Sequence, residues 1–229
     1  MTELLFREDP YLRSCEATVV SVREGGVELD RTIFYPLGGG QAGDTGRVGS
    51  CRVINTVKSP SGDSVLHLLE SAGGIEAGMK VPIEIDWDRR HSLMRYHTAL
   101  HLLGAVVKAP VTGGRIAPDK AHLDFDIEMD KLVKGEIEER LRALVDLGVE
   151  TEASWISDAE LDARPDLVRT MSVAPPRGEG RVRLLEIPGV DLQACGGTHV
   201  RSTAEIGPLA VARIRSEGKR IKRVTICFA

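Results

Sequence analysis

Two short clusters of metal-binding side chains stand out in the 229-residue sequence. His97 and His101 lie four residues apart in a run that is typical of a helix, where positions i and i+4 share one face. Cys195 and His199 lie far downstream, on either side of a Gly-Gly pair that allows a sharp bend of the backbone. Imidazole and thiolate ligands suit Zn²⁺ better than Ca²⁺ or Mg²⁺, which prefer oxygen. If the two clusters meet, they form a zinc site.

The number of ligands decides what such a site does. Four protein ligands close a tetrahedral site, whereas three leave a position for water or substrate. The sequence leaves open whether His199 is the fourth ligand. A histidine pair at this spacing also arises by chance, and the second cluster is what makes a metal site the better interpretation. His67, His91 and His122 belong to neither cluster, and we expect them to be structural.

Composition permits a packed core and limits the kinds of partner. The chain is 42% hydrophobic and only 4% aromatic, with a formal net charge of -4, which argues against a generally basic RNA-binding coat. One segment differs, because residues 213–223 hold one acid and six basic residues: Arg213, Arg215, Lys219, Arg220, Lys222 and Arg223. This local excess either contacts phosphates or forms an ordinary solvated hairpin.

Cysteine usage and hydropathy indicate the compartment. The four cysteines are widely scattered, so a disulfide framework is not expected, and Cys15, Cys51 and Cys227 read as small buried residues of strands. The first residues lack the pattern of a signal peptide, and no apolar run is long enough for a membrane span. We therefore expect a cytoplasmic protein.

The hydrophobic pattern predicts an α+β protein of two domains, residues 1–86 and residues 87–229. The first reads as a small β-barrel because short strands recur between turns. Its expected strands are 17–22, 26–29, 32–35, 47–57, 64–69 and 80–86, with a glycine-rich loop at 36–46. Gly38, Gly39 and Gly40 in that loop serve either a flexible turn or a close approach to a phosphate.

The second domain is predicted to mix helices and strands. A helix from 87 to 108 carries the His97 pair and ends near Pro110, Gly113 and Gly114. An amphipathic helix is expected at 131–147, and Ser157 with Glu160 has the spacing of a capping box. The expected strands are 121–126, 149–156, 181–187 and a terminal hairpin of 209–215 with 220–228.

Several motifs occur together in one order. Phe34-Tyr35-Pro36 precedes Gly38-Gly39-Gly40-Gln41, and the two metal-binding clusters precede Gly218-Lys219-Arg220-Ile221. This order resembles the editing region of alanyl-tRNA synthetase, and the chain is similar over nearly its full length to the freestanding AlaX family, medium type. The chain has no room for an ATP-binding aminoacylation core, so the implied activity is ATP-independent.

The resemblance implies a zinc-dependent hydrolase in an α+β editing domain. Its expected substrate is tRNA(Ala) mischarged with serine, with glycine left open, and it releases the amino acid and free tRNA. By this resemblance His97, His101, Cys195 and His199 hold Zn²⁺, and a zinc-associated water is the expected catalyst, with no protein base assigned. Neither a membrane nor an obligate protein partner is expected.

The same resemblance suggests further contacts. Thr98, Thr112 and Gln41 are candidates for binding the substrate, although both threonines also read as ordinary helix and loop hydroxyls. Gly38, Gly39 and Gly40 resemble the motif that holds the tRNA end, and Arg220 is a candidate for the acceptor stem.

Three other functions remain open at this point. A threonyl-type editing module shares both metal-binding clusters, although the glycine motif favours the alanyl branch. A zinc-stabilised tRNA-binding module without activity would unfold when the metal is removed. A metallopeptidase is the weakest alternative, because Thr98 stands where the glutamate of its helical motif belongs.

Overall fold

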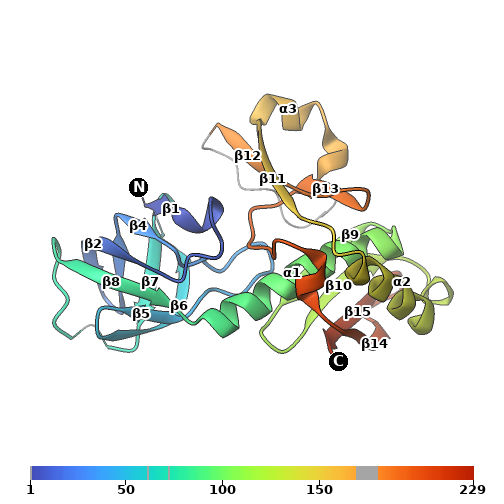
Figure 1. The fold of residues 1–229 in the computed structure, drawn as a ribbon, viewed down its shortest axis with the longest axis horizontal. Coiled ribbons are helices and arrows are strands. Elements are labelled where there is room, and N and C mark those ends of the chain that lie inside the picture. The colour runs from blue at the N-terminus through green and yellow to red at the C-terminus, as the bar shows by residue number, and fades with distance from the viewer. Residues whose placement is uncertain (1, 61, 72, 169–179) are drawn as a thin grey trace. The chain divides into compact units, whose positions relative to one another are not determined.

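The computed structural model describes residues 2–60, 62–71, 73–168 and 180–229 (Figure 1). The chain forms two compact units, Met1–Ser92 and Leu93–Ala229. The division falls inside the long helix α1 (Trp87–Val107). Within the described ranges, no helix combines the length and the apolar character that crossing a membrane requires.

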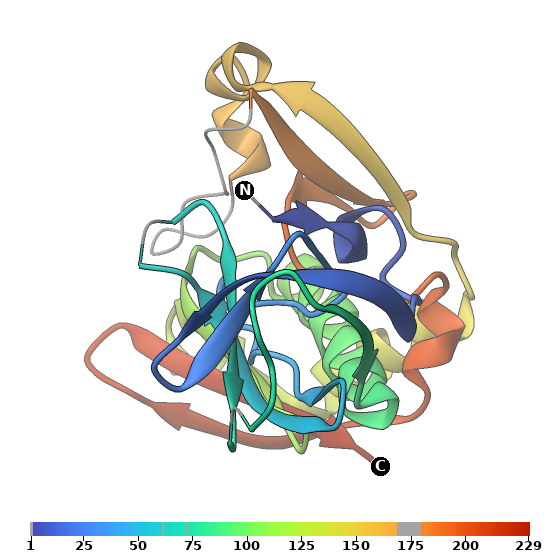
Figure 2. The same ribbon diagram turned by 90° about the vertical axis from the view of Figure 1, so that its left-hand side faces the viewer.

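The first unit is built on a closed antiparallel barrel (Figure 2). Around the barrel the strands follow the order β2-β3-β7-β6-β5-β8. Their bounds are β2 (Ser14–Arg23), β3 (Gly26–Leu29), β5 (Gly46–Val48), β6 (Cys51–Lys58), β7 (Val65–Leu69) and β8 (Lys80–Ile85). A short parallel pair of β1 (Glu3–Leu4) with β4 (Arg31–Thr32) accompanies it, together with a 3₁₀ turn at Leu5–Arg7. The predicted small barrel is confirmed.

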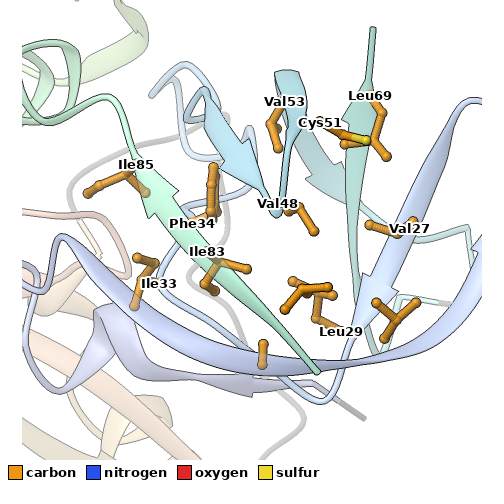
Figure 3. Packing of buried hydrophobic residues seen from close by; sticks show 13 residues of the cluster. Val27, Leu29, Ile33, Phe34, Val48, Cys51, Val53, Leu69, Ile83 and Ile85 are labelled. Atoms are coloured by element: carbon orange, nitrogen blue, oxygen red, sulfur yellow. The ribbon is translucent and has the colours of Figure 1, made fainter. Parts of the chain in front are cut away.

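Alternation of side chains fills the barrel. Along β8 every second residue is buried, so that Val81, Ile83 and Ile85 point inward and the residues between them face solvent. The inward side chains of the other strands meet them in one apolar cluster, as Figure 3 shows for Val27, Leu29, Val48, Val53 and Leu69. The core therefore rests on aliphatic residues, as the low aromatic content predicts.

Two of the expected strands differ in the structure. Of the expected strand 32–35, only Thr32 pairs, as the second residue of β4, because the backbone N–H of Tyr35 donates to the Asp44 carboxylate rather than to a neighbouring strand. The expected strand 47–57 is two strands, β5 and β6, separated by a turn at Gly49, whose φ is +56°. Side-chain acceptors and tight turns of this kind interrupt a ladder without changing the hydrophobic pattern.

The second unit has two sheets. One has the order β14-β15-β10-β9 and comprises β9 (Val111–Ile116), β10 (Ala121–Asp126), β14 (Leu209–Ser216) and β15 (Ile221–Phe228). The other has the order β11-β12-β13 and comprises β11 (Glu152–Ser157), β12 (Arg181–Ile187) and β13 (Asp191–Ala194). The helices are α1, α2 (Lys134–Asp146) and α3 (Asp158–Asp162), with 3₁₀ turns at Met129–Lys131, Pro165–Leu167 and Thr203–Ile206.

Most predicted elements of this unit are present, but β9 and β13 were not expected. The region of Gly113 and Gly114 was interpreted as a loop that ends the helix. It is a strand, and a Cβ on Gly114 would come within 2.8 Å of the Leu123 side chain on β10. Here glycine permits close strand packing rather than a turn. The predicted capping box of Ser157 and Glu160 is confirmed at the start of α3.

Candidate metal centre

Helix α1 places two histidines in the interior of the second unit. Its residues after Leu93 are largely buried on all sides, which explains why the helix shows little amphipathic contrast. Arg95 fixes this part of the helix, because its guanidinium donates to the Ile206 carbonyl at 2.6 and 2.9 Å and covers the Phe228 ring. His97 and His101 on successive turns are 8% and 6% exposed. The predicted helical histidine pair is therefore present and buried.

Strand β13 delivers the cysteine by simple alternation. Leu192 and Ala194 pack against the apolar cluster of the second sheet. Asp191, Gln193 and Cys195 alternate with them and lie on the opposite face of the strand. The backbone N–H of Cys195 donates to the Arg183 carbonyl at 3.0 Å, which continues the pairing with β12 beyond the end of the strand.

The structure brings the four predicted ligands together. One ligand atom from each of His97, His101, Cys195 and His199 lies within 4.8 Å of the others. The Cys195 Sγ is 3.4 Å from Nε2 of His97 and 3.2 Å from Nε2 of His199. Zinc–ligand bonds of 2.0–2.3 Å in a tetrahedron place neighbouring ligand atoms about 3.5 Å apart. The donor set and its spacing thus fit Zn²⁺, with His199 inside the group.

A buried carboxylate orients His101. Its Nδ1 lies 2.8 Å from the Asp191 Oδ2, and Asp191 is 5% exposed. The Gln193 amide donates to the same oxygen at 2.6 Å. Because the carboxylate accepts, Nδ1 carries the hydrogen and Nε2 faces the other ligands. Carboxylate–histidine pairs of this kind commonly support metal-binding imidazoles.

Thr98 orients His199 in a similar way. Its hydroxyl donates to the Met94 carbonyl at 3.1 Å and accepts from the Val200 backbone N–H at 3.3 Å. Since its one hydrogen is used on Met94, the contact of 3.2 Å with Nδ1 of His199 requires the imidazole to donate. Nε2 of His199 is then the ring nitrogen without a hydrogen, and it lies beside the Cys195 sulfur.

Burial and charge set the protonation of the group. Burial raises the pKa of the Cys195 thiol, but the charges of His97 and His199 and hydrogen bonds from the imidazoles outweigh it and hold that pKa well below its usual value. Burial lowers the pKa of His199 well below its ordinary value. Burial lowers the pKa of His101 too, yet Asp191 and Cys195 raise it to about 9. The surrounding imidazoles therefore favour the thiolate form of Cys195, which is the form that binds metals.

Arg183 holds the segment between the two downstream ligands. Its guanidinium donates to the carbonyls of Cys195 at 3.2 Å and Gly197 at 3.1 Å, and the residue is 7% exposed. Neither Gly196 nor Gly197 is among the described glycines with positive φ. The turn is consequently held by a buried cation, and it does not use the left-handed backbone that only glycine adopts easily.

The other predicted residues lie on separate elements. Thr112 is on β9, where its hydroxyl donates to the Asp124 carbonyl at 3.2 Å, and Arg220 is exposed and paired with Asp126. Gln41 is buried in the first unit. Gly39 and Gly40, with φ of +57° and +82°, form a two-residue turn closed by hydrogen bonds between Gly38 and Gln41. For these residues, contact with substrate or tRNA stays a prediction.

Asp191 and Arg183 were missed by the sequence reasoning. A signal for Asp191 is visible afterwards in the alternation of Asp191, Gln193 and Cys195, which share one side of a strand. Arg183 carries no such signal, because an arginine in an apolar strand is recognised only when its carbonyl partners are known.

Two regions of the chain match families of tRNA synthetase domains. Residues 182–225, which include Cys195 and His199, match the family described as the threonyl and alanyl tRNA synthetase second additional domain. Residues 10–89 match class II (A) tRNA synthetases. Two of the four candidate ligands thus lie in a segment that resembles the additional domain of these synthetases.

The full-length relatives are more specific. The chain is 36% identical to the alanyl-tRNA editing protein AlaX-M of Saccharolobus solfataricus over 98% of each chain, and 34% identical to that of Methanosarcina barkeri, again over 98% of each. The alanine–tRNA ligase of Ignicoccus hospitalis is 35% identical, over 97% of this chain and 25% of the ligase. The chain belongs to the AlaX family of alanyl-tRNA editing proteins.

Proposed function

We propose that this protein is a trans-editing hydrolase that deacylates mischarged Ser-tRNA(Ala), in the cytoplasm and without ATP. Gly-tRNA(Ala) is a second candidate substrate for the same site. The observation that carries the proposal is the buried convergence of His97, His101, Cys195 and His199. Relatives that are named alanyl-tRNA editing proteins and align over nearly the whole chain support the substrate class.

The need for such an activity follows from the size of alanine. Serine adds one hydroxyl and glycine lacks one methyl group, so a synthetic site distinguishes either from alanine by only a few kcal/mol. A second site that recognises the extra hydroxyl and hydrolyses the ester supplies the missing discrimination. In this proposal residues 87–229 form the hydrolytic domain and residues 1–86 the glycine-motif domain.

The four convergent side chains would hold Zn²⁺. When bound, the ion supplies Lewis-acid polarisation of the ester carbonyl or lowers the pKa of a water molecule. The chain's own contribution is orientation. Asp191 and Thr98 hold the imidazoles of His101 and His199 with Nε2 free, and Arg183 holds the cysteine segment. Four protein ligands leave no open tetrahedral position, so direct contact with substrate requires a further coordination position or release of one ligand.

The proposal assigns the contacts with substrate and tRNA to residues on several elements of the chain. Thr112 is the candidate for the serine hydroxyl, while the hydroxyl of Thr98 is buried and already engaged by Met94, Val200 and His199. Gln41 and the glycine turn are proposed for the tRNA end. Arg220, with its side chain 67% exposed, is proposed for the acceptor stem.

The test is release of labelled serine from Ser-tRNA(Ala), with Ala-tRNA(Ala) as the paired substrate. We expect rapid loss of serine, sparing of alanine, and a decrease of at least about 100-fold in Cys195→Ala, because catalytic metal chemistry supplies several kcal/mol. Cys227→Ala is the matched control, since Cys227 is also partly buried but lies outside the ligand group. Absence of serine release from folded, zinc-loaded wild type would contradict the proposal.

A threonyl-type specificity is the second candidate. It is favoured by the family description, which names the threonyl enzyme together with the alanyl enzyme. The same assay with Ser-tRNA(Thr) separates the two. We expect little release from that tRNA, and preferential release from it would transfer the assignment to the threonyl branch.

A further inference from the structure

None of the four candidate ligands lies on the four-stranded sheet of the second unit, and one face of this sheet is polar. Strand registry places Arg115 of β9 beside His122 of β10, His122 beside Thr225 of β15, and Thr225 beside Arg213 of β14. These four residues form one row across the sheet. The next row on the same face consists of Gly113, Asp124, Arg223 and Arg215.

The opposite face of the sheet is part of the core. Leu123 and Phe125 on β10 alternate with His122 and Asp124, and they are 9% and 0% exposed. On β15 the residues that alternate with Arg223 and Thr225 are buried in the same way. The polar face therefore belongs to a sheet whose other side is held rigidly by packing. Figure 2 shows β14 and β15 as long strands in red.

Arginine dominates the polar face. Arg115, Arg213, Arg215, Arg220 and Arg223 lie on it or at its edge, against three carboxylates, Asp124, Asp126 and Glu217. Five positive and three negative groups leave a local charge of +2 in a chain whose net charge is -4. We call this surface the arginine face.

Among the described residues, the ion pairs on the arginine face leave one arginine on each outer strand without an acidic partner. Arg223 binds both carboxylate oxygens of Asp124 at 2.7 and 2.8 Å, and Arg220 binds Asp126 at 2.7 Å. Arg215 pairs with Glu217. Among the described residues, no ion pair involves Arg115 or Arg213, and both are exposed.

The charges of several arginines act on one side chain, His122. Burial lowers the pKa of His122, and the nearby charges of Arg223, Arg115 and Arg215 lower it further, while the charge of Asp124 opposes them. Three different strands thus contribute positive charge around a single side chain at the centre of the face.

We propose that the arginine face binds the sugar-phosphate backbone of a helical stem of tRNA, with Arg115 and Arg213 as phosphate contacts. This inference rests on the proposed function, which makes tRNA the substrate. The two residues are three strand spacings apart, about 14 Å, so one small anion does not reach both. A-form RNA carries phosphates along both rims of a wide, shallow groove, and guanidinium groups bind phosphates in pairs of hydrogen bonds.

The experiment measures binding of uncharged tRNA(Ala) by fluorescence anisotropy over a series of salt concentrations. The double variant Arg115→Gln/Arg213→Gln is compared with Arg140→Gln/Arg142→Gln, which removes the same charge from exposed positions on α2. For the first double variant we expect about a tenfold rise in Kd. We also expect a shallower salt dependence, in which the negative slope of the log of the association constant against log salt becomes smaller in magnitude by about 2.

The outcomes separate this proposal from the proposed function. Equal Kd and equal salt slope for the two double variants would overturn the arginine face. Competition by polyglutamate as strong as that by tRNA would also overturn it, because the face would then fit an acidic protein. If the binding differences appear although no serine is released, the arginine face stands and the hydrolase assignment fails.

Discussion

At the scale of single residues, charge balance distinguishes Asp191 from an ordinary polar neighbour. In the proposed site, a zinc ion would bring a charge of +2 into a group whose three histidines are all buried. The Cys195 thiolate would offset one unit, and the Asp191 carboxylate would offset the other through His101. Burying an uncompensated charge is costly, so a neutral assembly is the form that the interior tolerates.

Replacement of Asp191 tests this balance. Asp191→Asn retains the size of the side chain but removes the charge, and we expect zinc affinity to fall by about 10- to 100-fold, as for other outer partners of metal-binding histidines. Competition with a chromophoric chelator at constant pH measures the change. Asp146→Asn on the exposed end of α2 is the control, and equal affinities of the two variants would rule out the role of Asp191.

The four side chains that converge in the candidate metal centre were predicted from sequence, but the residues that support them were not. Two histidines at helical spacing and a cysteine–histidine pair carry their chemistry in their residue types. The orienting contacts of Thr98 with His199 and of Arg183 with Gly197 depend on segments about 100 and 14 residues apart meeting in space. No local pattern encodes such a meeting.

At the scale of elements, hydrophobic periodicity predicted α2 and most strands, because each of these has a clear period along its length. Two of the missed or altered strands are short. β13 has four residues and β5 has three, which is too few for alternation to be read. In β9 the pair Gly113 and Gly114 reads as a breaker, and only its partner β10 shows that small residues are required there.

The barrel contains a histidine whose expected structural role has a measurable consequence. His67 is 0% exposed, and its Nδ1 donates to the Val27 carbonyl at 3.2 Å while its Nε2 accepts from the Thr32 hydroxyl at 2.7 Å. Burial lowers the pKa of His67 from 6.5 to about 4. The unfolded chain therefore binds a proton between pH 6.5 and 4 that the folded barrel excludes, and stability falls as the pH is lowered through this window.

His67→Gln removes this titration. Between pH 7 and 4.5 we expect wild type to lose on the order of 2 kcal/mol more of its free energy of unfolding than the variant does. Urea unfolding followed by Trp87, which packs against the barrel core, measures the difference, with Trp155→Phe in both proteins. The same pH dependence in both proteins would show that His67 titrates normally in the fold.

At the scale of the whole molecule, the two units predict an uneven response to loss of metal. All four ligands belong to Leu93–Ala229, and that unit also has an extensive apolar core of its own. We expect a chelator to abolish serine release and to lower the melting temperature reported by Trp155, while the transition reported by Trp87 is unchanged. Single-tryptophan variants separate the two signals.

Readdition of Zn²⁺ is the control for this experiment and is expected to restore activity. Complete unfolding of the second unit at 25 °C after chelation would instead identify the metal as a folding requirement. That result would favour the tRNA-binding module over the hydrolase.

The division inside α1 limits how the two halves can be exchanged between proteins. A cut before Trp87 keeps the helix whole but removes Arg90 from the Asp44 carboxylate and from the carbonyls of Ile33 and Pro10. A cut after Ser92 keeps these bonds but divides the helix five residues before His97. Neither cut preserves both the contacts of Arg90 and an unbroken α1. A gene fusion that recruits only the C-terminal half must therefore supply a new start for this helix, or carry the barrel along with it.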